Sequence, residues 1–155
     1  MSNLKGLLKK YQISSSKLQI EVLETGLMKN IQSAQRVLND LIVLGIKVAL
    51  DDFGTGYSSL TYLRRLPISI LKIDQGFIQG MINDKDDEVI VKAIIAMSRD
   101  LDVRLLAEGI ETKEQLDVLK KIGCEMGQGY YFGKPMSAYD FENRFLIRDD
   151  FFGVN

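Results

Sequence analysis

The sequence contains no histidine and only one cysteine, Cys124. Without histidine, zinc sites of the usual nitrogen and sulfur type and nucleophile triads that need an imidazole base are both excluded. A lone cysteine cannot form a disulfide within the chain. Any catalysis must therefore use carboxylates, lysine and a metal held by oxygen atoms, which favours magnesium, manganese or calcium.

Long apolar runs and a strong net charge are also missing. No stretch is long and apolar enough for a signal peptide or a membrane span. The formal net charge of -1 gives no basic footprint for DNA or a membrane surface. The 155 residues are 46% hydrophobic and 26% charged, which is typical of one globular domain. We expect a cytoplasmic chain, or the cytoplasmic part of a larger membrane protein.

Apolar strands alternate with amphipathic helices along the whole chain. Five segments have the pattern of strands: residues 17–23, 46–52, 68–74, 103–109 and 126–132. Helices are predicted over residues 28–44, from Ser58 through Leu66, over residues 84–101, from Thr112 to just before Gly123, and from Ser137 or Asp140 onward. Thr112 and Gln115 have the spacing of a capping box. This alternation predicts parallel β/α units whose strands are buried on both faces.

Charged and polar residues cluster at the ends of the predicted strands, where β/α folds place their ligands. They are Glu21, Glu24, Asp51, Asp52, Lys72, Asp74, Glu108, Glu111 and Gln128. The adjacent Asp51 and Asp52 would raise each other's pKa unless a positive group lies beside them. A divalent cation and Lys72 are the candidates for that group. Lys72 and Asp74 are two positions apart on a strand, so both point to one face.

Five short stretches of the sequence resemble, in order and spacing, the successive motifs of the EAL family of cyclic di-GMP phosphodiesterases. They are IEVLE, LDDFGTGYSSL, LKIDQGFI, LAEGIET and GQGYYFGKP. The match runs from about Leu18 to Pro135. The resemblance implies a TIM-like (β/α) barrel that opens cyclic di-GMP to the linear dinucleotide pGpG, with Mg²⁺ or Mn²⁺ and an attacking water.

The resemblance also implies a role for each motif residue. Metal ligands would be Glu21 for a first ion, Asp51 shared by two ions, and Asp52 and Glu108 for the second. Lys72 would orient the attacking water, and Glu108 would also be the general base. Supporting residues would be Glu24, which would steady the loop after the strand of Asp51, together with Asp74, Glu111 and Gln128. Tyr57 and Ser58 would approach the guanine or phosphate of the substrate.

Most of these residues also have a purely structural interpretation. The two aspartates could be a helix N-cap and a solvated turn residue, and Glu21 could form a buried salt bridge. Lys72 and Asp74 could belong to a structural ion pair. Glu111 and Gln128 could cap an element or face solvent, and Tyr57 and Ser58 could belong to a polar turn.

Two parts of the family pattern are absent from this sequence: the first-strand glutamate-alanine-leucine motif and an asparagine on the second strand. A full barrel of this kind needs about 250 residues. We therefore expect residues 1–155 to form a single partial EAL domain, an incomplete barrel of about five strands. The chain would be a fragment, a natural truncation or a split domain, and alone it would be weakly active or inactive.

Three interpretations of function stay open. The first is a metal-dependent cyclic di-GMP phosphodiesterase in bacterial second-messenger signalling. The second is a non-catalytic module derived from an EAL domain that binds cyclic di-GMP or a protein. The third, an enolase-like magnesium-dependent barrel, explains the acids and lysine but not the five ordered motifs. Because five strands leave open edges, we also expect a homodimer, and a longer parent could carry a sensor or diguanylate cyclase-like domain.

Overall fold

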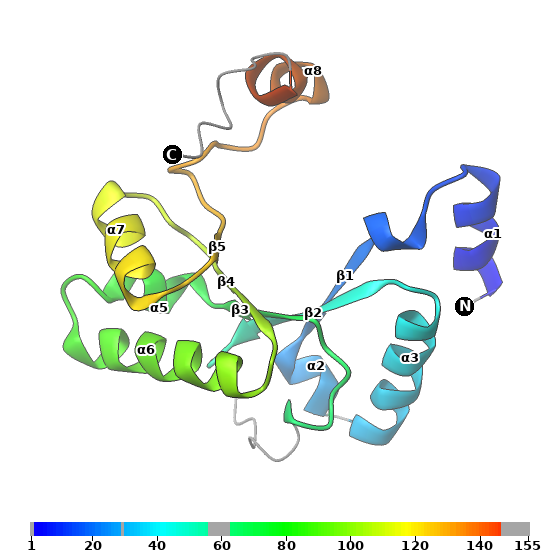
Figure 1. Cartoon of the computed structure of the whole chain (residues 1–155), viewed down its shortest axis with the longest axis horizontal. Coiled ribbons are helices and arrows are strands. Elements are labelled where there is room, and N and C mark those ends of the chain that lie inside the picture. The colour runs from blue at the N-terminus through cyan, green and yellow to red at the C-terminus, as the bar shows by residue number, and fades with distance from the viewer. Residues whose placement is uncertain (1, 29, 56–62, 147–155) are drawn as a thin grey trace.

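Five parallel strands form one sheet in the order β1-β2-β3-β4-β5, so each strand lies beside the one before it in the chain. The computed structural model describes residues 2–28, 30–55 and 63–146. The strands are β1 (Gln19–Leu23), β2 (Lys47–Phe53), β3 (Ile70–Ile73), β4 (Arg104–Ala107) and β5 (Met126–Gly127). Sequential parallel order is that of a barrel segment, and it confirms the predicted β/α alternation (Figure 1).

Most of the helices lie on one side of the sheet between successive strands, whereas the first helix precedes β1 and the last lies apart from the sheet after β5 (Figure 1). The α-helices of the described residues are α1 (Ser2–Lys10), α2 (Glu24–Met28), α3 (Ile31–Val43), α5 (Gln75–Gly80), α6 (Lys85–Asp100), α7 (Lys113–Ile122) and α8 (Ala138–Phe141). A 3-10 turn, η1 (Ser15–Lys17), precedes β1, and a π-helical turn, η2 (Glu142–Leu146), follows α8. None of the helices in the described residues is long and apolar enough to cross a membrane.

Helix ends agree with the capping chemistry of the sequence, with one exception. The Thr112 and Gln115 capping box is present, and α7 ends at Gly123 in the left-handed region with φ of 85°. The predicted start of a helix at residue 28 is wrong, because the Asn30 side chain accepts a hydrogen bond from Ser33 N and begins α3 there. The predicted helix from Ser58 falls mostly outside the described residues.

The last strand is much shorter than predicted. β5 ends at Gly127, whereas the pattern predicted a strand over residues 126–132. The chain turns after it, since the N–H groups of Phe132 and Gly133 donate to the carbonyl oxygen of Gly129 at 3.1 Å and 3.4 Å. A Cβ atom at Gly129 would overlap the backbone of Ile110, so the turn packs closely on the loop after β4.

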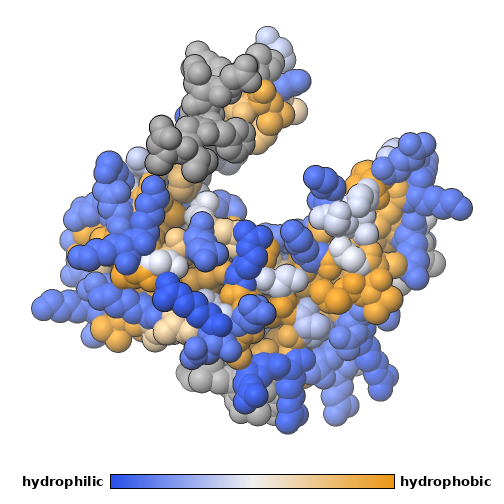
Figure 2. Space-filling model, viewed as in Figure 1, coloured by the Kyte–Doolittle hydropathy of each residue, from blue (hydrophilic) through white to orange (hydrophobic). Residues whose placement is uncertain are grey.

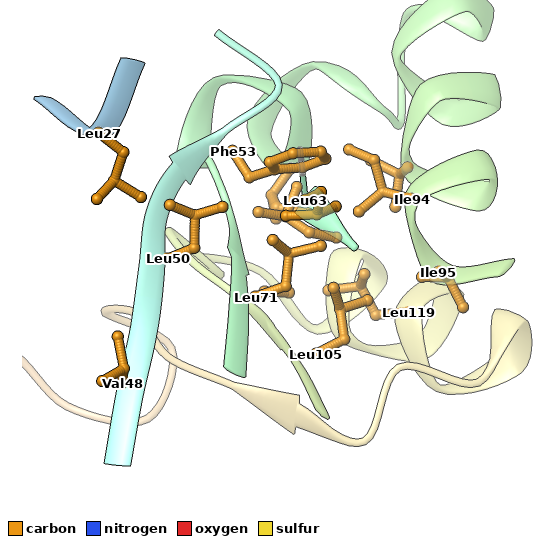
Figure 3. Close-up of a cluster of buried hydrophobic side chains, with 14 of the residues drawn as sticks. Leu27, Val48, Leu50, Phe53, Leu63, Leu71, Ile94, Ile95, Leu105 and Leu119 are labelled. Atoms are coloured by element: carbon orange, nitrogen blue, oxygen red, sulfur yellow. The ribbon is translucent and has the colours of Figure 1, made fainter. Parts of the chain in front are cut away.

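The core lies between the sheet and the helices that cover it. All four residues of β3 are buried, and Val48, Ala49 and Leu50 of β2 are buried as well. Figure 3 shows Phe53 beside Ile94 of α6, with Leu71 in the same cluster of buried side chains. Because Leu71 and Ile73 join this core, Lys72 between them points to the opposite face of the sheet. That face lies on the hollowed side between α1 and α8 (Figure 2).

Candidate active site

Charged side chains from four neighbouring strands meet at one edge of the sheet. Glu21 lies on β1, Asp51 and Asp52 on β2 and Lys72 on β3, while Glu108 directly follows β4. In parallel strands the carboxyl ends share an edge, so residues far apart in sequence come together there. The register pairs Leu23 with Asp51, which sets β1 beside the aspartates.

The Lys72 ammonium group lies among three carboxylates. Lys72 Nζ is 2.7 Å from Glu21 Oε2, 2.9 Å from Asp51 Oδ1 and 2.8 Å from Glu108 Oε1. Only 4% of the Lys72 side chain is exposed. Burial opposes its charge, but the hydrogen bonds that Lys72 donates to Glu108, Glu21 and Asp51 outweigh burial and hold the pKa of Lys72 above its usual range. We call Lys72, Glu21, Asp51 and Glu108 the lysine cluster.

The two adjacent aspartates reach the same site because β2 is irregular. On a regular strand, neighbouring side chains point to opposite faces. Here the pairing of β2 with β3 shifts between Leu50 and Phe53, and Asp52 adopts a φ of 54°. The side chain of Asp51 also accepts a hydrogen bond from Asp52 N at 3.1 Å. This bulge turns both carboxylates toward the site.

Asp51, Asp52 and Glu108 could hold a metal ion together. One carboxylate oxygen from each lies within 4.8 Å of the other two. Oxygen-only ligands suit hard divalent cations such as Mg²⁺, Mn²⁺ and Ca²⁺. We call these three residues the carboxylate triad; it shares Asp51 and Glu108 with the lysine cluster, whereas Glu21 contacts Lys72 outside the triad.

Two members of the triad hold their protons more tightly than ordinary carboxyl groups. Burial raises the pKa of Asp52, and repulsion from Asp51 and Asp74 adds to it. Burial also raises the pKa of Glu108, against the lowering effect of its bond to Lys72. One lysine therefore does not fully compensate the negative charge of the site, and a divalent cation would stabilise the ionised forms.

The expected supporting residues lie around this edge, with different contacts. Glu24, only 2% exposed, accepts a hydrogen bond from Gly54 N at 3.1 Å and so joins α2 to the loop after β2. Asp74 accepts from Gly76 N at 2.8 Å as the N-cap of α5. The backbone N–H groups of Gly54 and Gly76 thus fix the positions of these two carboxylates.

The remaining candidates make looser contacts or lie outside the described residues. Glu111 Oε1 accepts a hydrogen bond from Gln79 Nε2 at 3.3 Å. Nothing in the sequence indicated that Gln79 would contact this region, since it is an ordinary polar residue on a short helix. Gln128 directly follows β5, and its backbone N–H donates to the carbonyl oxygen of Ala107 on β4 at 2.8 Å. Tyr57 and Ser58 belong to the stretch that the structure does not describe.

Comparison with known proteins decides the family. A model of the EAL domain matches residues 1–135. The chain belongs to the EAL domain family. The resemblance seen in the five motifs is therefore confirmed, and so is the EAL-type incomplete barrel.

Relatives of this EAL chain include two larger proteins of Pseudomonas aeruginosa. The chain is 42% identical over 138 residues to the bifunctional diguanylate cyclase/cyclic di-GMP phosphodiesterase MucR, covering 89% of this chain and 20% of MucR. It is 47% identical over 119 residues to the cyclic di-GMP phosphodiesterase NbdA, covering 77% of this chain and 15% of NbdA. The EAL chain thus spans a fifth or less of the length of these relatives.

Solved EAL structures have the same fold. The MucR phosphodiesterase in complex with cyclic di-GMP matches with a TM-score of 0.87 and 41% identity, over 90% of this chain and 57% of that chain. The BlrP1 protein of Klebsiella pneumoniae, in complex with manganese and cyclic di-GMP, matches with a TM-score of 0.81 and 31% identity, over 86% of this chain and 34% of that chain.

Proposed function

We propose that this EAL chain carries most of the active site of a metal-dependent cyclic di-GMP phosphodiesterase that forms pGpG in bacterial second-messenger signalling. The observation that supports it most is the cluster in which Lys72 Nζ contacts Glu21, Asp51 and Glu108 within 2.9 Å. Acids gathered around a buried lysine at the ends of parallel strands are suited to holding divalent cations, which in turn bind and activate an anionic ester. The names of MucR and NbdA support the same substrate.

The carboxylate triad would hold one Mg²⁺ or Mn²⁺ ion, and Glu21 would be a ligand of another ion that shares Asp51. One oxygen atom from each residue of the triad already lies within 4.8 Å of the other two, and a manganese complex of the related BlrP1 supports the choice of ion. When bound, divalent ions polarise the phosphodiester and lower the pKa of a bound water. Aspartate and glutamate oxygens are the ligands that such ions prefer.

The chain's own residues would orient and deprotonate the attacking water. Lys72, charged at neutral pH, would orient the attacking water and lower the repulsion among the carboxylates around it. Glu108 would accept the proton of the attacking water, and burial raises its pKa toward the range that suits a general base. Glu24 would steady the loop after β2 through Gly54.

We further propose that the chain alone is weakly active or inactive, because it has no counterpart of the first-strand glutamate and second-strand asparagine of the family. The same observation favours a second candidate function, a non-catalytic module that binds cyclic di-GMP or a protein partner. A homodimer, and a parent protein with a sensor or diguanylate cyclase-like domain, stay proposals; the name of MucR supports the latter.

The proposal is tested by titrating the chain with Mn²⁺ and then with cyclic di-GMP in a calorimeter, and by following pGpG formation chromatographically. We expect Mn²⁺ binding that weakens at least ~10-fold in Asp51→Asn, with little or no pGpG. Absence of Mn²⁺ binding by the folded chain would contradict the metal site. Turnover that is abolished by Asp51→Asn would overturn the expected inactivity.

A further inference from the structure

Four polar residues are buried in the described part of the chain, and the burial of three of them has an evident reason. They are Glu24, Lys72, Ser98 and Gln115. A buried polar group costs free energy unless it is hydrogen-bonded. Lys72 belongs to the lysine cluster, Glu24 holds the loop after β2, and Ser98 bonds to the backbone of its own helix. Gln115, on α7, is the residue whose burial still needs a reason.

The side chain of Gln115 accepts one more backbone hydrogen bond than a capping box requires. Gln115 is only 6% exposed, and its Oε1 atom accepts hydrogen bonds from Glu111 N at 2.8 Å and from Thr112 N at 3.0 Å. A capping box needs only the bond to the N-cap residue, here Thr112. The second bond, to Glu111, reaches back into the loop that precedes α7.

That loop carries Glu108 at its other end and is held along its length. Glu108 N donates to Ile73 O at 3.3 Å, and Ile110 N donates to Gln128 O at 3.1 Å. Gly109 has a φ of 69° and passes so close to Gln75 that a Cβ atom would lie 2.5 Å from the Cβ of Gln75. The orientation of Glu108 therefore depends on a loop whose last two N–H groups are fixed by Gln115.

We propose that Gln115 is a positioning residue for Glu108: its buried amide oxygen fixes the loop of residues 108–112 so that the Glu108 carboxylate faces Lys72 and Asp51. The inference rests on the proposed function, in which Glu108 is a metal ligand and the general base. Gln115 acts only through the loop backbone. Side chains that orient a metal ligand in this way typically change metal affinity ~10–100-fold when they are removed.

Three variants of the full chain separate positioning from simple helix capping. Gln115→Met keeps the length but loses the acceptor, Gln115→Glu keeps an acceptor oxygen, and Thr112→Val removes only the hydroxyl that Gln115 N bonds at 3.2 Å. Each is measured for Mn²⁺ affinity by calorimetry, for amide exchange of Glu111 by NMR, and for the ¹⁵N shift of the Lys72 ammonium. The Lys72 shift reports the contact with Glu108 without any metal.

We expect Gln115→Met to weaken Mn²⁺ binding at least ~10-fold, speed exchange of the Glu111 amide and move the Lys72 signal. Gln115→Glu restores all three, and Thr112→Val lowers Tm but leaves them unchanged. If Gln115→Met does not fold, Gln115→Asn, whose shorter side chain cannot reach Glu111, replaces it with the same expected results.

Equal effects of Gln115→Met and Thr112→Val, or no rescue by Gln115→Glu, would show that Gln115 is a helix cap and overturn the inference. A wild-type chain that does not bind Mn²⁺ would instead contradict the proposed function. In that case the Lys72 signal still decides: a shift unchanged by Gln115→Met contradicts positioning, and a moved shift supports it.

Discussion

At the residue scale, Lys72 compensates three carboxylates that would otherwise repel one another. Lys72→Met should leave Glu21, Asp51 and Glu108 without their shared cation, and we expect the free energy of unfolding to fall by about 3 kcal/mol. That value is the low end for a broken buried pair, because 44% of the Glu21 side chain is exposed. Urea denaturation measures the change.

Lys92→Met is the matched control for this prediction. Lys92 Nζ lies 2.6 Å from Glu88 on the surface of α6, an i,i+4 pair. Such pairs contribute only about 0.3–0.5 kcal/mol. If Lys72→Met were as mild as Lys92→Met, the lysine cluster would not hold the strand ends together.

Two carboxyl groups of the triad make metal binding sensitive to acid. The raised pKa values of Asp52 and Glu108 mean that both take up protons at a higher pH than ordinary carboxyls, and a metal requires them ionised. We expect Mn²⁺ affinity to fall as pH decreases from about 7.5 to about 5. Calorimetric titrations across this range test it, and an affinity independent of pH would contradict it.

Lower pH has the opposite effect on the contribution of these two carboxyl groups to the stability of the metal-free chain. A carboxyl whose folded pKa is raised binds its proton more tightly in the folded state than in the unfolded state. Asp52 and Glu108 therefore cost stability at neutral pH, and this cost decreases as pH falls through their folded pKa values. Asp52→Asn should reduce this pH dependence, as urea denaturation at several pH values would show.

At the scale of the element, the turn that follows β2 requires a glycine at position 54. Gly54 has a φ of 102°, and a Cβ atom there would lie 2.7 Å from Cε2 of Phe77. We expect Gly54→Ala to lower the free energy of unfolding by about 1–3 kcal/mol, because the backbone would be strained and Phe77 displaced. Urea denaturation gives the value.

Gly26→Ala provides the comparison. Gly26 lies in α2 with nothing within 4 Å of an added Cβ atom. Alanine in a helix is favoured over glycine by about 0.5–1 kcal/mol, so this variant should stabilise the chain. Opposite signs for the two substitutions are the expected result, and equal signs would show that the turn after β2 tolerates a side chain.

The elements differ in how far the sequence could predict them. Periodicity and capping residues predicted α6, α7 and the strands, because those signals are local. The bulge at Asp52 could not be read from KVALDDF, since a regular strand would give the same letters. The early end of β5 depends on the contact between Gly129 and Ile110, which only the tertiary structure brings together.

The sequence could indicate which described residues come together at the strand ends, but not the contacts that they make there. Motif spacing indicated that acids and Lys72 would share one edge, because parallel strands align their carboxyl ends. It could not show that Glu21 lies outside the carboxylate triad or that Gln79 contacts Glu111. Those contacts depend on side-chain reach across the sheet rather than on sequence spacing.

At the scale of the whole molecule, the sheet has two outer strands, β1 and β5, each paired on one side in the described structure. Leu23 on β1 is 52% exposed, and Tyr130 and Phe141 beyond β5 are 56% and 49% exposed. Open edges and exposed apolar side chains favour association. We expect a homodimer in which two partial barrels cover one another.

Light scattering coupled to size exclusion, at several protein concentrations, measures the mass of the particle. A mass twice that of the 17.5 kDa chain is the expected result. A monomer that unfolds cooperatively at every concentration would show that the chain seals its edges by itself.

We expect Asp51, Asp52 and Glu108 to form a divalent-metal site beside Lys72. Anomalous diffraction at the manganese edge, from crystals of the chain grown with Mn²⁺, tests it most directly. We predict a peak in contact with oxygens of all three carboxylates, which lie within 4.8 Å of one another in the structure. No peak there, or a peak bound only by residues outside the carboxylate triad, would show that these three residues do not form the metal site.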